Sequence, residues 1–187
     1  MGLVSKNKYF IHLAFSCRVG FVFLSFLKFS PIYSMSQRRK ARKAVLQALY
    51  ANAISKGKWT HITNSVLKPR LKDDKENFKF AERLFLKAVN NSETVDEIIQ
   101  NHINNWKIER LNTIDRLILE MAITEFLFFE EIPPKVTINE AIEIAKKFST
   151  KQSGNFVNGI LDSALEQLQK DGRINKKGRG LIETSLN

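Results

Sequence analysis

The sequence has little of what disulfides, metal sites and enzyme active sites need. Its single cysteine, Cys17, cannot form an internal disulfide, so we expect a reducing compartment, the cytoplasm. The histidines His12, His61 and His102 are far apart and have no cysteine at ligand spacing, which argues against a metal site. No glycine-rich phosphate loop or nucleophile elbow occurs. We therefore predict no cofactor and no enzymatic activity.

Strand patterns are also missing, because no stretch alternates apolar and polar residues with a period of two. Apolar residues recur instead at three- and four-residue spacing, which is typical of amphipathic helices. At 187 residues the chain supports one domain, or two small helical lobes that share a core. The predicted fold class is all-α.

Acidic residues are absent from residues 1–34. The apolar run from Tyr9 to Phe29 carries Arg18 near its middle, which makes it too interrupted for a membrane span of about 20 apolar residues. The basic, acid-free composition would also suit a targeting segment. We favour a translation start at Met35, where the helical patterns begin, with residues 1–34 as an extension outside the fold.

Positive charge is in excess, since 30 Lys and Arg residues against 19 Asp and Glu residues give a net charge of +11. A surplus of this size suits a polyanionic partner. Residues 170–187 share the basic character and contain several glycines. We predict that they form a solvated, disordered tail.

Apolar stripes predict helices over residues 36–54, 78–89, 94–106, 114–128, 137–145 and 156–168. Trp106 is expected to close the third of these against the core. Thr94 with Glu97, and Thr137 with Glu140, have the spacing of a capping box, so each pair is expected to begin its helix. Residues 55–75 lack a sustained period and are predicted to be a loop or a weak, short helix, and residues 149–154 are predicted to be a loop.

The first predicted helix begins with a cluster of five cations, Arg38, Arg39, Lys40, Arg42 and Lys43. Cations at a helix N-terminus oppose the helix dipole, so their placement indicates a function that requires positive charge, the alternative being a solvated, frayed helix start. Gln47 and Tyr50 share the polar face with Arg39 and Lys43. An amide can read the edge of an unpaired base and a tyrosine can stack on it, so this face is predicted to bind single-stranded RNA.

Several motifs follow one another in an order that resembles the NusB family of transcription antitermination factors, from about Ser36 to Leu168. They are the basic segment Arg38–Arg42, Gln47-Ala48-Leu49-Tyr50, the run Pro133–Phe148 and the motif Phe156–Asp162. The resemblance implies a compact domain over residues 35–169, with about seven helices in two small bundles.

The resemblance also implies partners: the boxA element of nascent ribosomal RNA, the ribosomal protein NusE, and an RNA polymerase antitermination complex that transcribes ribosomal RNA operons to their ends. In this family the N-terminal basic segment binds RNA. Phe156 and Asn158 resemble positions near the RNA, although Phe156 also fits the apolar stripe of its helix.

The segment from Thr113 to Phe129 resembles the partner-facing region of the family, with Asp115 and Arg116 as candidate NusE contacts. Glu120 stands where many members carry Arg, and Thr124 where many carry Tyr. We expect these departures to alter RNA or partner contacts around that helix.

Two competing interpretations follow. Some ribosomal RNA cytosine methyltransferases begin with a NusB-like domain, but the residues after the last predicted helix leave no room for a further domain of ~100–150 residues. A NusB-like module for protein interaction or dimerisation, without strong RNA binding of its own, is the second interpretation. The sequence leaves the choice between monomer and homodimer open.

Overall fold

The structure is a computed structural model that describes residues 31–55, 57–103 and 107–181, with side chains described from Gln37 onward. The chain divides into two compact units, Met1–Met35 and Ser36–Asn187. The second unit is called the helical domain below. The predictions for residues 1–30, for Cys17 and for Trp106 lie outside the described residues, whereas residues 31–34 of the predicted extension form the first turn of a helix.

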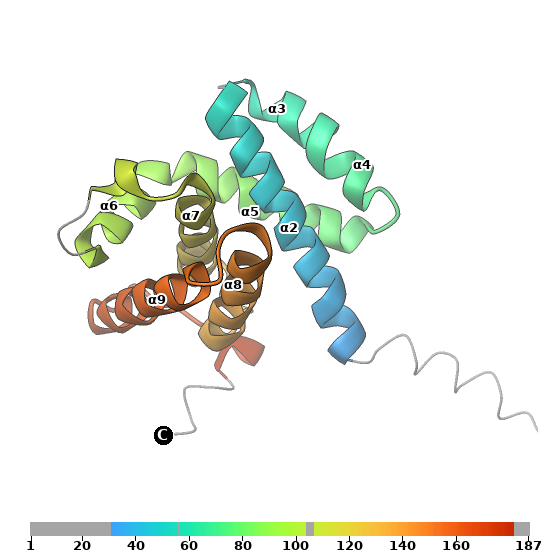
Figure 1. Cartoon of the computed structure of the whole chain (residues 1–187). Coiled ribbons are helices and arrows are strands. Elements are labelled where there is room, and N and C mark those ends of the chain that lie inside the picture. The colour runs from blue at the N-terminus through green and yellow to red at the C-terminus, as the bar shows by residue number, and fades with distance from the viewer. Residues whose placement is uncertain (1–30, 56, 104–106, 182–187) are drawn as a thin grey trace, which may run out of the picture. The chain divides into compact units, whose positions relative to one another are not determined.

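All regular elements of the described residues are helical (Figure 1), which confirms the all-α fold class. The α-helices are α2 (Pro31–Ser55), α3 (Trp59–Ile62), α4 (Lys68–Leu71), α5 (Lys75–Asn90), α6 (Ser92–His102), α7 (Thr113–Phe128), α8 (Pro134–Phe148) and α9 (Ser153–Lys170). A π-helical segment, Thr63–Leu67, joins α3 to α4, and short 3-10 turns cover Ile108–Arg110 and Gly178–Leu181.

The helices form two groups. In one group α7, α8 and α9 pack on one another and α6 packs against α7 and α9, while in the other α4 and the π-helical segment pack against α5. Helix α5 also packs against α7 and so connects the groups. Helix α2 crosses in front of α5 in Figure 1, and its side chains contact α5, α7 and α8. This arrangement agrees with the expected domain of two small bundles.

Helix α7 is the central element of the core. Every residue from Leu117 to Phe126 is buried, as expected of a helix that is surrounded by others on all sides. Three of these buried residues are polar, namely Glu120, Thr124 and Glu125. Because buried polar groups need hydrogen-bond partners, we expect these three side chains to make polar contacts inside the domain.

The capping-box prediction for Thr94 and Glu97 is wrong. Helix α6 begins at Ser92 with Asn91 as its N-cap residue, so Thr94 lies inside the first turn. The threonine and the glutamate have the spacing of a capping box, but the observed N-cap residue lies three residues before Thr94.

The second capping-box prediction, for Thr137 and Glu140, is wrong for a different reason. Helix α8 begins at Pro134, whose fixed φ suits the first helical position. The Thr137 hydroxyl donates to the Glu125 carboxylate at 2.9 Å, and Glu140 accepts from Arg39. Both side chains therefore connect helices to one another instead of capping their own helix.

Residues 55–75 are more ordered than predicted. From Trp59 to Leu71 the backbone forms consecutive helical segments, and Ile62, Leu67 and Leu71 are buried in the core. The packing of these three side chains against the domain stabilises a segment whose sequence alone shows no sustained period. Helix α9 likewise begins earlier than predicted, at Ser153.

Most of residues 171–181 are exposed, but the segment is attached to the rest of the domain. Lys176 is buried, and its amine donates to the carbonyls of Glu125 at 3.1 Å and Phe129 at 2.9 Å. The Lys177 N–H donates to the Glu130 carbonyl at 2.9 Å. The last carbonyls of a helix have no partner within it and favour a nearby cation, so the segment docks at the C-terminal end of α7.

Candidate nucleic-acid interface

The five predicted cations do not stand at the N-terminus of their helix, because α2 begins at Pro31, seven residues before Arg38, and they do not form one surface. Arg42 is only 3% exposed, and its guanidinium makes two bonds to the Glu125 carboxylate, at 2.7 and 2.9 Å. Burial by itself lowers the pKa of Arg42, but Glu125 raises it overall, so the ion pair keeps its charge. The prediction of an RNA contact by Arg42 is wrong, because this side chain lies in the core.

The Arg39 side chain is partly buried and partly exposed to solvent. Its guanidinium makes two bonds to the buried carboxylate of Glu140, at 2.8 and 2.7 Å, while 38% of the side chain remains exposed. Glu140 also lies 4.0 Å from Arg42. Together Arg39, Arg42, Glu125, Glu140 and Thr137 form a network that joins α2 to α7 and α8, and we call it the buried ion network.

Arg38 packs against α5. Its guanidinium bonds the Glu76 carboxylate at 2.6 Å and lies 4.5 Å from the centroid of the Phe80 ring. Glu76 itself is exposed, so this pair is accessible to solvent and only partly neutralises Arg38. The contact places the part of α2 around Arg38 beside the start of α5.

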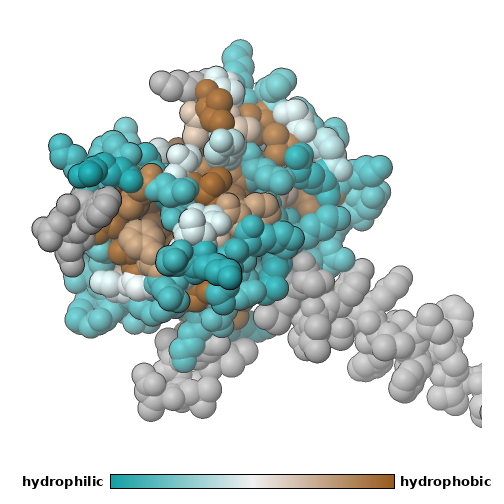
Figure 2. Space-filling model, viewed as in Figure 1, coloured by the Kyte–Doolittle hydropathy of each residue, from teal (hydrophilic) through white to brown (hydrophobic). Residues whose placement is uncertain are grey.

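The remaining candidates of α2 form a row on its outer side. Lys40, Lys43, Gln47, Tyr50 and Ile54 follow one another at three- and four-residue spacing, which places them on one face over ~21 Å. Lys40 and Gln47 are exposed, and Tyr50 is 42% exposed. Ile54 at the end of the row is exposed as well, and Figure 2 shows apolar residues reaching the surface in the region where α2 ends in Figure 1. We call these five residues the outer row.

Lys43 is the least exposed cation of the outer row. Partial burial, together with the nearby cations Lys147 and Arg39, lowers the pKa of Lys43. The three cations lie on α2 and α8, so positive charge extends from the outer row onto α8. An anion bound there would relieve the repulsion among these cations.

The structure brings together two residues that the sequence assigned to different partners. Phe156 of α9, expected near RNA, and Asp115 of α7, expected near a protein, line one pocket of about 570 Å³. Phe156 is 37% exposed, whereas Asp115 is buried and accepts a bond from the Ser153 hydroxyl at 2.9 Å. Asp115 therefore fixes the start of α7 against the start of α9.

Asn158 lies on the outer side of α9. It is half-buried and donates to the Asp162 carboxylate of the same helix at 2.9 Å. No core contact holds its amide among the bonds of the described residues, so its side chain is available to a ligand after a small rearrangement.

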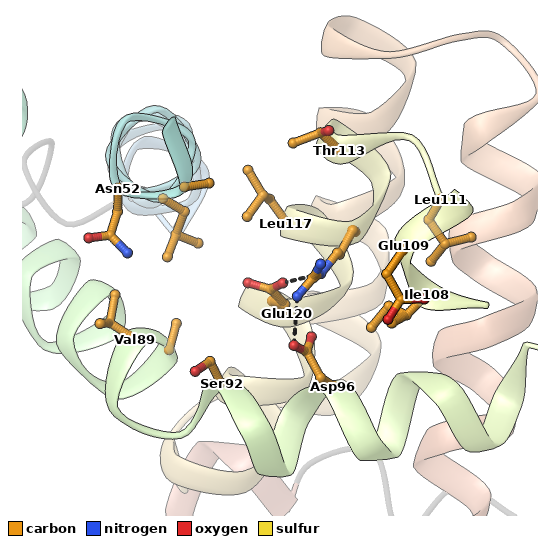
Figure 3. A pocket seen from close by; sticks show the side chains of 14 residues that line it. Asn52, Val89, Ser92, Asp96, Ile108, Glu109, Leu111, Thr113, Leu117 and Glu120 are labelled. Atoms are coloured by element: carbon orange, nitrogen blue, oxygen red, sulfur yellow. Dashed lines mark hydrogen bonds and ion pairs between the residues drawn. The ribbon is translucent and has the colours of Figure 1, made fainter. Parts of the chain in front are cut away.

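Arg116 lies in the wall of a second pocket, of about 380 Å³, between the ends of α2 and α5, helix α6 and helix α7 (Figure 3). Its guanidinium bonds Asp96 at 2.6 Å and Glu120 at 2.9 Å, as the dashed lines in Figure 3 show. Burial of Glu120 and the nearby charge of Asp96 raise the pKa of Glu120 to about 7, although Arg116 opposes the shift. One arginine thus serves two carboxylates.

The two departures from the family pattern lie inside the domain. The Glu120 carboxylate takes the bond from Arg116, and Thr124 is fully buried with its hydroxyl donating to the Glu120 carbonyl at 2.7 Å. Thr124 therefore has no direct contact with solvent, and its effect on a partner would have to act through the packing of α7.

Sequence reasoning missed the roles of Glu125 and Glu140. Both stand on helices whose inward faces are mostly apolar, and an ionised residue at such a position is seldom buried unless it is paired. A glutamate within an apolar stripe was therefore the available signal for a buried cation. That cation, Arg42, was assigned to the surface instead.

Two further classes of site find no support within residues 31–55, 57–103 and 107–181. No helix there is long and apolar enough to cross a membrane. No group of three or more His, Cys, Asp or Glu residues is arranged there to hold a metal ion.

The family model described as the NusB family matches residues 39–166. The transcription antitermination protein NusB of Salinibacter ruber is 49% identical over 148 residues, which cover 79% of this chain and 92% of that protein. The protein of the same name from Natranaerobius thermophilus is 37% identical over 135 residues, covering 71% of this chain and 97% of the relative.

Two solved structures are similar in fold. T. maritima NusB has a TM-score of 0.64 at 37% identity and covers 70% of this chain and 91% of its own. A crystal structure of the antitermination factors NusB and NusE in complex with dsRNA has a TM-score of 0.62 at 24% identity, covering 71% of this chain and 98% of the matched chain. At that identity the second likeness concerns the fold alone.

Proposed function

The chain belongs to the NusB family of transcription antitermination factors, and from this premise we propose that it binds the boxA element of nascent ribosomal RNA together with the ribosomal protein NusE. In this proposal the complex joins RNA polymerase in the cytoplasm and carries transcription of ribosomal RNA operons to their ends. The NusB family acts in transcription antitermination and is not a family of enzymes.

The outer row of α2 is the observation that carries the RNA part of the proposal. Lys40 and Lys43 supply positive charge for phosphates at one end, and Gln47 and the exposed ring of Tyr50 follow along the same face. Charge followed by an amide and an aromatic ring is the combination by which proteins hold a single strand and stack its bases. The exposed edges of Arg38 and Arg39 add partial charge beside the row.

We place Phe156 and Asn158 at a second RNA contact and the region of Asp115 and Arg116 at the NusE contact. The apolar pocket beside Phe156 offers space for a base or a side chain of the partner. Asp115 contributes by holding α7 against α9, and Arg116, which is partly exposed, contributes from the wall of the neighbouring pocket.

The salt dependence of RNA binding tests the proposal. Two phosphate contacts, by Lys40 and Lys43, give a slope of about −1.4 in log K against log salt for a single strand, and four, with Arg38 and Arg39, give about −2.8. Between 50 and 200 mM salt we therefore expect affinity for boxA RNA to fall between about sevenfold and fiftyfold. Filter binding with boxA and scrambled RNA, each with and without NusE, measures it.

The second candidate function is a protein-interaction or dimerisation module without strong RNA binding of its own, acting as a monomer or a homodimer. Arg42 is bound to Glu125 in the core, and Arg39 is partly buried and bound to Glu140, so fewer than five cations are accessible to RNA. This reduced charge favours the second candidate function. A slope near zero without NusE, with a normal complex in its presence, would support this module and overturn independent RNA binding.

We also propose that translation begins at Met35 and that residues 1–34 are an extension outside the fold. The start of the family match at residue 39 supports this start site. A chain that begins at Met35 should fold and bind boxA RNA as the full chain does. Loss of the helical circular dichroism signal in the shorter chain would show that residues 1–34 contribute to the core.

A further inference from the structure

Helix α5 carries a stripe of cations on its solvent side. Lys75, Lys79, Arg83 and Lys87 stand four residues apart, and all four are exposed. Residues four apart on a helix lie one above the other, so these side chains form a line with ~6 Å between neighbours and ~18 Å in total. We call these four residues the α5 stripe.

Two members of the α5 stripe are held in place by the end of α7. Arg83 donates to the Phe128 carbonyl at 2.7 Å, pairs with Glu131 at 3.1 Å and lies 4.2 Å from the centroid of the Phe129 ring. The Lys87 amine lies 4.9 Å from the centroid of the Phe128 ring. Phe128 is only half-buried, so an aromatic ring adjoins the stripe at the surface.

The other two members are free to meet an external anion. No ion pair of Lys75 or Lys79 occurs among the described residues. Lys79, Arg83 and Lys87 also line a shallow groove of about 370 Å³, whose remaining lining residues are Glu82, Leu86, Asn90 and Asn91. Three cations face one carboxylate in this groove, and the amides add hydrogen-bonding groups.

The start of the α5 stripe adjoins the part of α2 around Arg38. Arg38 bonds Glu76, the residue next to Lys75, and lies over the Phe80 ring, the residue next to Lys79. A strand that leaves the outer row at the N-terminal part of α2 therefore reaches α5 at the end where the stripe begins.

We propose that the α5 stripe binds the sugar-phosphate backbone of single-stranded RNA that flanks the segment held by the outer row of α2. The inference rests on the proposed RNA binding and adds a second contact surface to it. A line of single positive charges at regular intervals, with an aromatic ring beside it, complements the repeating phosphates and bases of a single strand. An acidic protein segment would need carboxylates at the same regular intervals.

The test compares two RNAs and two triple variants of the full chain. The short RNA is boxA alone, and the long RNA carries about 10 further nucleotides at each end, within the range of known single-strand sites. Lys75→Gln, Lys79→Gln and Lys87→Gln together remove the stripe but keep Arg83, which holds the end of α7. Lys107→Gln, Lys135→Gln and Lys170→Gln form the matched control, because they remove the same charge from exposed positions elsewhere.

We expect the wild type to bind the long RNA more tightly than the short one. The stripe variant should lose this gain, by up to about a hundredfold at 0.1 M salt with a salt slope smaller by about 2 if all three phosphate contacts are made. Its affinity for the short RNA should stay unchanged, and the control variant should bind both RNAs as the wild type does. In the unmodified protein, long RNA should protect Lys75 and Lys79 from acetylation, as mapped by mass spectrometry.

Two results would overturn the inference: an equal loss of affinity for long RNA in the stripe and control variants, or an unchanged affinity of the stripe variant for long RNA. In either case, tight binding of the short RNA would still support the proposed function. Failure of the wild type to bind either RNA would overturn both. If the stripe variant instead keeps RNA affinity and loses NusE, the stripe is a protein contact and the assignment to RNA is wrong.

Discussion

The inner and outer sides of α2 use the same type of charge in opposite ways. On the inner side Arg42 and part of Arg39 are bound to the buried carboxylates of Glu125 and Glu140. On the outer row no carboxylate of the described residues forms an ion pair with Lys40 or Lys43. The number of cations in a sequence cluster therefore overestimates the positive charge that is accessible to a ligand. The accessible charge of each cation depends on whether a neighbouring helix places a carboxylate beside it.

The largest expected effect comes from breaking the inner side. Arg42→Ala should lower the free energy of unfolding by about 3–5 kcal/mol, because it leaves the Glu125 carboxylate buried without its cation. Urea unfolding followed by circular dichroism measures the loss. Lys40→Ala is the control on the same helix, and it should change stability by less than about 0.5 kcal/mol. An Arg42→Ala protein as stable as the wild type would show that the buried ion network does not hold α2.

The same contrast between inner and outer sides can be tested on α9. Leu161 is fully buried, so Leu161→Ala should cost about 2–5 kcal/mol through lost burial and the cavity left behind. Asn158→Ala should cost little stability, since its amide bonds only Asp162 on the same helix, and should reduce affinity for boxA RNA. Equal destabilisation by the two substitutions, with normal RNA binding of the folded Asn158→Ala protein, would make Asn158 a structural residue.

Arg42 and Arg116 differ in how many carboxylates they bind through hydrogen bonds. Arg42 bonds Glu125, whereas Arg116 bonds both Asp96 and Glu120. The pKa of Glu120 is about 7 in the folded protein, against an ordinary value near 4.5. Between these values the folded state holds the proton that the unfolded state releases, so stability should fall as pH rises from 4.5 to 7. The loss should reach at most about 3 kcal/mol. Urea unfolding at several pH values should show this slope in the wild type and not in Glu120→Gln.

The smallest expected effect concerns the outer row alone. Tyr50→Ala should weaken binding of boxA RNA by about 1–3 kcal/mol, the value of one stacked base, while leaving stability nearly unchanged because the ring is exposed. Tyr50→Phe keeps the ring and should retain most of the affinity. If Tyr50→Phe weakens binding as much as Tyr50→Ala, the hydroxyl rather than the ring contacts the RNA.

The helices were largely predictable because their apolar stripes persist over three or more turns. The contacts between helices were not. Thr137 and Glu140 had the spacing of a cap, yet both side chains bond other helices, and spacing along one helix carries no information about what the next helix presents. Arg42 could have been placed correctly, since it stands three residues before Val45 and seven before Leu49, on the buried face.

The docking of residues 171–181 could not be predicted in the same way. Lysine and glycine are abundant there, and this composition is typical of solvated tails. Two backbone carbonyls at the end of α7 accept hydrogen bonds from Lys176. Because every residue has a backbone carbonyl, the sequence does not indicate which ones will bind a lysine. The shared pocket of Phe156 and Asp115 could not be predicted for a different reason, because it forms only when α7 and α9 pack together.

The buried ion network also sets an order of events during synthesis. The carboxylates that bind Arg42 and Arg39 lie 83 and 101 residues further along the chain. Until the ribosome has delivered α7 and α8, both arginines remain in water and α2 displays all five of its cations. The nascent chain therefore carries more accessible positive charge on α2 than the finished protein, and the last steps of folding withdraw part of it.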